Sequence, residues 1–232
     1  MVTAMSTEAA FYRLLAWLSP AYPVGAFSYS HGLEWAVEAG LIRDRASFES
    51  WLATVLRHGC GWQDAVLLAH AHRRVSDRDH VGWCELRSLA QAWTPTAELA
   101  LETQAQGDAF AVASLASWPD PGGRLPDLLA DGPGLTYPLA VGAVAAVHLV
   151  PLAMVLPAYL QAFAANLVSA AVRAIPLGQT DGQKALAALE AVVGDVAALA
   201  AACPLDELGT ATLMVDLCSM RHETQYTRLF RS

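Results

Sequence analysis

The segment Gly178-Gln179-Thr180-Asp181-Gly182-Gln183-Lys184 is the best candidate for a phosphate-binding loop in this chain. Such a loop offers consecutive backbone N–H groups, with a lysine at a fixed offset that follows a glycine and precedes Ser or Thr. Here Gln183 precedes Lys184, no Ser or Thr follows it, and Asp181 would repel a phosphate. The sequence therefore argues against a nucleotide site in this loop.

A second cluster of chemically capable side chains lies between Gly25 and Glu34, which reads Gly-Ala-Phe-Ser-Tyr-Ser-His-Gly-Leu-Glu. Neither serine stands in the G-x-S-x-G pattern of a serine hydrolase. Ser28 or Ser30 can instead cap a following helix, with Glu34 near its positive end. Because aromatic and polar side chains lie close together here, the segment is also typical of a protein-contact surface.

Metal-binding chemistry would need His and Cys residues at ligand spacing. The candidate pairs are His58 with Cys60, His70 with His72, and Cys203 with Cys218. None has the spacing of a known zinc motif, and residues two apart point to different faces of a helix. We expect no tightly bound cofactor. A small helical metal carrier that uses His31, His70, His72 or the cysteines is the alternative function.

The last residues, 219–232, abandon the Ala/Leu composition of the preceding chain. One interpretation is a solvated, frayed tail, as is common at chain ends. The alternative is a segment that becomes ordered on a partner, with Tyr226, Arg228 and Phe230 as anchors of the kind enriched in binding hot spots.

These residues must be positioned by helices, because apolar residues recur at helical spacing and strand patterns are absent. Asp44 and Ser47 can each cap the helix that contains Phe48 to Leu56. The further helices are expected at 64–72, 84–93, 97–117, 139–149, from Leu152 or Ala158 to Ile175, after a cap at Asp181, and from Pro204 to Met220. The Pro/Gly-rich stretch 117–138 is expected to be an irregular connection. The prediction is an all-α, single-domain bundle of about nine to ten helices spanning 1–232.

Composition narrows the possible partners and the cellular location of the protein. Charged residues make up 16% of the chain and the formal net charge is −8, so nucleic acid is not expected as a partner. Residues 132–172 contain no charged side chain, but Pro151 and Pro157 divide them into shorter helices that suit a buried core rather than a membrane span. Four widely spaced cysteines and the absence of a secretory signal pattern predict a reduced, cytoplasmic protein.

Three segments together resemble the UreF-type urease accessory proteins: Leu18 to Glu34, Asn166 to Gln183, and Met220 to Phe230. Thr94 to Gly107 is a weaker fourth match. The similarity runs in order from about Phe11 to the end of the chain. The connection at 117–138 matches nothing in the family, and the apolar run Leu152–Leu156 replaces residues that the family tends to have polar or acidic.

The resemblance implies an all-α, non-catalytic cytoplasmic protein, often a homodimer. It would bind UreD (also called UreH) and recruit and regulate the GTPase UreG, and the assembled complex would deliver nickel to apo-urease. Carried over by position, the partner-binding residues are Tyr29, His31, Glu34, Gln179, Thr180, Gln183, Arg221, His222, Glu223, Tyr226, Arg228 and Phe230. For Gln179 and Thr180, burial in the dimer itself is an equally good account.

Overall fold

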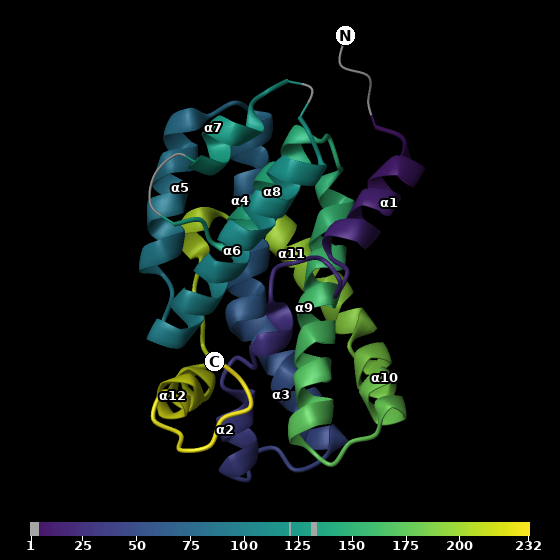
Figure 1. Ribbon diagram of the computed structural model, residues 1–232, viewed down its shortest axis with the longest axis vertical. Helices are drawn as coiled ribbons and strands as arrows, with labels where there is room; N and C mark the ends of the chain where they lie inside the picture. The colour runs from purple at the N-terminus through teal and green to yellow at the C-terminus, as the bar shows by residue number, and fades with distance from the viewer. Residues whose placement is uncertain (1–4, 121, 131–133) are drawn as a thin grey trace.

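The computed structural model of the chain describes residues 5–120, 122–130 and 134–232. These residues form α-helices and two short 3-10 helices, without a β-strand among them (Figure 1). Ten of the α-helices have ten or more residues, which confirms the predicted all-α bundle. The elements are α1 (Thr7–Trp17), η1 (Ala26–Ser28), α2 (Leu33–Glu38), α3 (Arg45–His58), α4 (Cys60–Ser76), α5 (His80–Ala92), α6 (Ala97–Ser117), α7 (Leu125–Ala130), α8 (Tyr137–Val147), α9 (Leu152–Ala174), α10 (Gln179–Ala188), α11 (Glu190–Ala202), η2 (Leu205–Glu207) and α12 (Leu213–His222).

Side-chain caps fix where several helices begin. Ser6, Asp79 and Thr96 each accept a hydrogen bond from a backbone N–H in the first turn of the helix that follows. At α3, Asp44 accepts from the Ser47 N–H at 2.9 Å, and the Ser47 hydroxyl accepts from the Asp44 N–H at 3.1 Å. Both residues that the sequence offered as caps thus act together, as a capping box.

The core is centred on α8, which packs against α4, α6 and α9 (Figure 1). Every residue of α8 from Pro138 to Ala146 is buried. Helix α9 is the one helix of the described residues that is long and apolar enough to cross a membrane, and half of its apolar window is buried; α10 and α11, bent by 42°, pass only as a pair. A buried core helix meets the same length and hydropathy criteria. In this chain, residues 134–172 of the uncharged stretch form part of the core.

Pro157 lies inside α9, so the prediction that it divides this stretch into two helices is wrong. Pro151 does stand at the helix start, where its carbonyl accepts a hydrogen bond from the Val155 N–H. Pro157 removes one helical hydrogen bond in the second turn. Burial of Tyr159 and Leu160 just after it keeps the helix continuous through the core.

The connection at 117–138 is less irregular than predicted, because it contains the short helix α7. The Asp120 carboxylate accepts hydrogen bonds from three of the backbone N–H groups that follow it, and α7 then buries Leu125 and Leu129. Six residues are too few to show a helical period against so many prolines and glycines. The other parts of this prediction, residues 121 and 131–133, lie outside the described residues.

Two further helix starts differ from prediction. Gly178 occupies the N-cap of α10 and Asp181 lies in the first turn, so Asp181 is not the cap. Pro204 precedes η2 rather than the last helix, which begins at Leu213 and ends at His222. The intervening Gly-Thr-Ala-Thr stretch, residues 209–212, has three residues of low helix propensity, which explains the interruption.

Gly107, inside α6, is required by a close backbone approach. A Cβ there would overlap the Leu135 carbonyl. On helix propensity alone, Gly107→Ala would add about 1 kcal/mol of stability. We expect instead a loss of about 1–3 kcal/mol in the free energy of unfolding, because the neighbouring backbone is overpacked. Urea denaturation checks the sign. Gly194→Ala in α11, where a Cβ meets no atom within 4 Å, is the matched control; a stabilised Gly107→Ala protein would contradict the packing.

Candidate functional site

The segment before α2 is shaped by residues with positive φ, among them Gly25 and Gly32 at 74° and 72°. Gly32 is the N-cap of α2, and a Cβ there would lie 2.7 Å from the backbone nitrogen of Ser219 in α12. Glycine is therefore needed both for its φ and for this contact. Neither predicted cap occupies that position, although the Ser30 hydroxyl accepts a long, 3.4 Å hydrogen bond from the Glu34 N–H.

A buried charge cluster joins α2, α6 and α12. The His222 ring is fully buried, with Nε2 3.1 Å from Glu34 Oε2 and Nδ1 2.7 Å from Glu98 Oε2. Each ring nitrogen thus faces one carboxylate oxygen at hydrogen-bond distance. The Glu34–His222–Glu98 cluster therefore ties α2, α6 and α12 together through a single buried ring.

The residues after α12 fold back onto this cluster. Glu34 accepts hydrogen bonds from the backbone N–H groups of Leu229 at 2.7 Å and Phe230 at 3.0 Å. Arg228 donates to the second carboxylate of the cluster, Glu98, at 3.0 Å. The interpretation of this segment as a frayed, solvated tail is therefore wrong: it is ordered on its own chain.

Arg173 holds the same segment from the side of α9. Its guanidinium lies 4.4 Å from the ring centroid of Phe230 and 3.6 Å from that of Phe27, within cation–π range of both. It also donates to the Phe27 carbonyl at 2.8 Å. The Ser232 hydroxyl donates to Glu102 of α6 at 2.6 Å. The segment before α2 and the end of the chain thus form one packed unit.

The predicted partner-binding residues divide by exposure. Tyr29, Glu34, His222 and Phe230 are buried and His31 is largely so, which prevents direct contact with a partner in this conformation. The exposed ones are Gln179, Thr180, Gln183, Arg221, Glu223, Tyr226 and Arg228. Helices α3 and α9 lie between α12 and α10 (Figure 1). A partner role for the exposed residues stays a prediction, and the structure places them on two separate surfaces.

Exposed apolar side chains gather on α12 and the segment that follows it. The members of this set, which we call the α12 surface, are Leu213, Met214, Leu217, Met220, Tyr226 and Leu229. The four on α12 repeat at the spacing of one helix face. Most of them escaped the sequence analysis, because an apolar stripe on a helix predicts burial in the core equally well.

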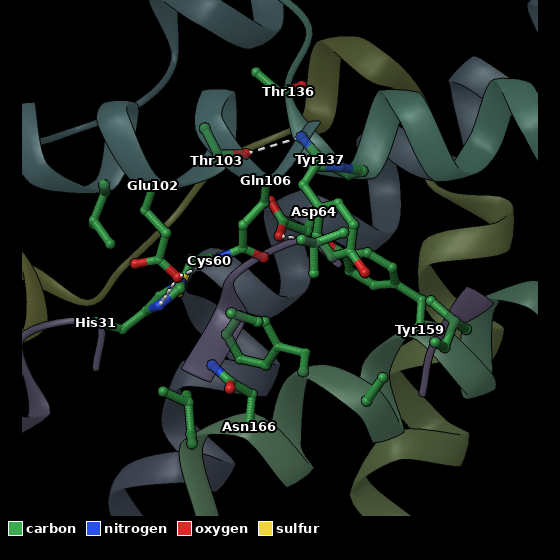
Figure 2. Close-up of a pocket in the computed structure, with 18 of the residues that line it drawn as sticks. His31, Cys60, Asp64, Glu102, Thr103, Gln106, Thr136, Tyr137, Tyr159 and Asn166 are labelled. Atoms are coloured by element: carbon green, nitrogen blue, oxygen red, sulfur yellow. Dashed lines mark hydrogen bonds and ion pairs between the residues drawn. The ribbon is translucent and has the colours of Figure 1, made fainter. Parts of the chain in front are cut away.

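Behind His31 lies a cavity of 280 Å³ between the loop that precedes α2 and helices α4, α6, α8 and α9 (Figure 2). His31 Nδ1 is 2.9 Å from Glu102 Oε1, at an angle that makes an ion pair rather than a hydrogen bond. Burial opposes a charged ring, but the Glu102 carboxylate and the Cys60 thiol outweigh it and raise the pKa of His31 well above its usual range. His31 therefore carries its charge toward the cavity wall, not toward a partner.

Asp64 lies on another wall of the cavity. The Tyr159 hydroxyl donates to Asp64 Oδ2 at 2.7 Å. Burial nevertheless raises the pKa of Asp64 to about 6, and it raises the pKa of Tyr137 and Tyr159, so that both phenols are neutral. Asp64 was not among the residues predicted from the sequence. The available signal was that Asp64 is the single acidic residue of α4, beside its most apolar part, residues 65–69.

No group of three or more His, Cys, Asp or Glu side chains in the described part of the chain could hold a metal ion. His70 and His72 contact the backbone carbonyls of Cys203 and Val150 at 3.0 and 2.8 Å. No disulfide joins the cysteines. The metal-carrier alternative thus lacks a preformed site among the described residues.

Comparison with known proteins gives a consistent result. The sequence model of the UreF family matches residues 42–190. The urease accessory protein UreF of Rhodopseudomonas palustris strain BisB18 is 54% identical over 97% of this chain and 92% of its own length. The protein of the same description from Bradyrhizobium sp. strain BTAi1 is 50% identical over 100% of this chain and 97% of its own.

Proposed function

This chain belongs to the UreF family of urease accessory proteins and has a role in urease maturation, and we propose on that premise that it is a non-catalytic adaptor. It binds a UreD-type (UreH-type) partner, recruits and regulates the GTPase UreG, and so supports nickel insertion into apo-urease. GTP hydrolysis is left to UreG, in keeping with the failed phosphate-loop pattern at Gly178–Lys184. Nickel is then cargo of the assembled complex rather than a cofactor of this chain. We place this activity in the cytoplasm.

The α12 surface is the observation that carries the adaptor proposal. Contiguous exposed apolar patches are uncommon on proteins that act alone, and they often mark sites of protein–protein contact. Tyr226 is fully exposed, although aromatic side chains of this type supply much of the energy of interfaces. The buried contacts of Phe230 and His222 hold Tyr226 and Leu229 in place, which reduces the ordering cost of binding. We therefore assign the α12 surface to the UreD-type partner, and the exposed face of α10 with Gln179, Thr180 and Gln183 to UreG or to a second copy of this chain.

Tyr226→Asp is expected to weaken binding to the UreD-type partner by about 30-fold or more, the effect of losing an interface hot spot of 2 kcal/mol. The fold should be unaffected, because Tyr226 contacts solvent. Co-expression with UreD and UreG, followed by size-exclusion chromatography with light scattering, measures the loss. A point substitution is preferable to truncation after Met220, since truncation would also remove the buried His222 and Phe230.

The matched control is Val81→Asp. Val81 is 69% exposed on the first turn of α5, between His80 and Trp83, which share a pocket with Asp127 and Leu128 of α7. Helices α7 and α12 lie at opposite ends of the molecule (Figure 1). This variant should co-elute with UreD and UreG like the unmodified chain. An unmodified chain that elutes alone would overturn the adaptor proposal. A Tyr226→Asp chain that still co-elutes would overturn the assignment of the α12 surface.

A further inference from the structure

The cavity behind His31 has a polar interior that the adaptor function does not use. Figure 2 shows His31, Cys60 and Glu102 on one side of it, and Asp64, Tyr137 and Tyr159 on the other. Asp64 retains some solvent-accessible surface although it is deeply enclosed, so this surface faces the cavity. The cavity reaches the outside near Pro20, Phe27 and Gln161, whose side chains line it and are exposed.

The two sides differ in how their charges are compensated. Glu102 faces His31 and also accepts hydrogen bonds from Gln106 at 2.9 Å and from the Ser232 hydroxyl. Asp64 has one hydrogen-bond donor among the described residues, the Tyr159 hydroxyl, and no ion pair there; the charge of His31 across the cavity offsets its burial only in part. A buried carboxylate without a cation is unfavourable unless it is protonated or a cation from outside pairs with it.

The rest of the wall suits the apolar part of a cationic ligand. The Tyr137 and Tyr159 rings lie 5.5 Å apart, and the Phe163 ring meets the His31 ring edge-on at 5.1 Å. Neutral aromatic faces attract ammonium and guanidinium groups, especially where water is excluded. The Thr136 hydroxyl, also in the cavity wall, is buried without a hydrogen-bond partner among the described residues.

Two other ligand classes fit less well. An anion would meet two carboxylates, Asp64 and Glu102, which repel it. A transition-metal ion needs three or more converging ligands, and no such group occurs in the described residues. An organic cation that carries its own hydrogen-bond donors and a short apolar stem does not need three converging ligands.

We propose that this cavity binds a small organic cation, an ammonium or guanidinium group on a short apolar stem, with its charged end at Asp64 and its stem against the aromatic wall. The chemistry is shared by a free small molecule and by an arginine or lysine side chain presented by a partner. The site is separate from the α12 surface, so it stands or falls independently of the adaptor function.

Binding is tested by NMR titration of the full chain with n-butylguanidinium and with n-butylurea, which has nearly the same shape and no charge. We expect n-butylguanidinium to bind at least tenfold more tightly. Asp64→Asn should remove this preference, whereas Asp216→Asn should keep it. Asp216 is a fair control because burial also raises its pKa, although it does not line the cavity.

The affinity for n-butylguanidinium should rise between pH 5 and pH 7 in the unmodified chain and stay constant in Asp64→Asn. The other ionisable groups that line the cavity around Asp64 are His31 from the loop, Cys60 from α4, Glu102 from α6, Tyr137 from α8 and Tyr159 from α9. The loss of the pH dependence in Asp64→Asn assigns it to Asp64 rather than to His31 or Glu102.

A second titration, with N-acetyl-arginine-methylamide, separates the two sources of the cation. Binding of this capped residue supports a partner's arginine, and binding of n-butylguanidinium alone supports a free small molecule. Equal affinities for n-butylguanidinium and n-butylurea would overturn the proposal, and this comparison needs no variant to fold. Nickel ions that bind in the same place and are lost in Asp64→Asn would also overturn it, in favour of a metal site.

Discussion

Replacing His222 with leucine is expected to lower the free energy of unfolding by about 3–5 kcal/mol, because it removes the hydrogen-bonding partner that two buried carboxyl groups share. The ring is fully buried and lies within 3.1 Å of both Glu34 and Glu98. Leucine fills a similar volume but leaves two carboxylates facing each other. Arg228 compensates only the Glu98 side, at 3.0 Å. Urea denaturation at pH 7 measures the loss.

A double-mutant cycle tests whether charge is the cause. Adding Glu34→Gln to His222→Leu should recover part of the stability, because a neutral amide replaces the uncompensated carboxylate. His58→Leu is the control, since His58 is exposed on α3 and its loss should change stability by less than about 0.5 kcal/mol. Hydrogen exchange of the Leu229 and Phe230 amides, which donate to Glu34, should also accelerate in His222→Leu. A loss below 1 kcal/mol with unchanged exchange would show that the cluster does not hold the tail.

The helices were predictable where local signals decide them. The capping box of Asp44 and Ser47 and the apolar stripe from Phe48 to Leu56 each need only a few neighbouring residues, and both are found in α3. Pro157 misled the prediction because its effect depends on tertiary packing. A proline beyond the first turn of a helix costs a hydrogen bond, but burial on both sides of it decides whether the helix continues.

The site was less predictable because its contacts join residues far apart in the sequence. Glu34 and His222 were both singled out, yet the sequence offered no reason to pair them across 188 positions. Their polarity suggested a surface that contacts a partner, and a buried charge network has the same composition. Asp64 was overlooked for the converse reason: one acidic residue among apolar neighbours carries no spacing pattern, and only the fold shows that it faces a cavity.

Asp64→Asn is expected to raise the free energy of unfolding at pH 7.5 by about 3 kcal/mol, from the shift of its pKa from 3.8 to about 6. The sign follows from linkage. The folded chain holds this proton more tightly than the unfolded chain does, so stability falls as the pH rises from about 4 through 6. Asparagine has no proton to lose and can still accept the Tyr159 hydrogen bond. The two proteins should therefore be nearly equal at pH 4 and diverge between pH 4 and pH 6, and the difference should be fully developed at pH 7.5.

Urea denaturation at several pH values measures this divergence, with Asp195→Asn as the control, because Asp195 is exposed on α11. Equal stabilities at pH 7.5 would contradict the enclosed, unpaired state of Asp64. A residue that lowers stability by this amount is readily replaced unless function retains it. If n-butylguanidinium stabilises the unmodified chain at pH 7.5 but not Asp64→Asn, the cation supplies the compensation that the fold omits. The stability lost in the free chain is then a consequence of keeping a site open for a ligand.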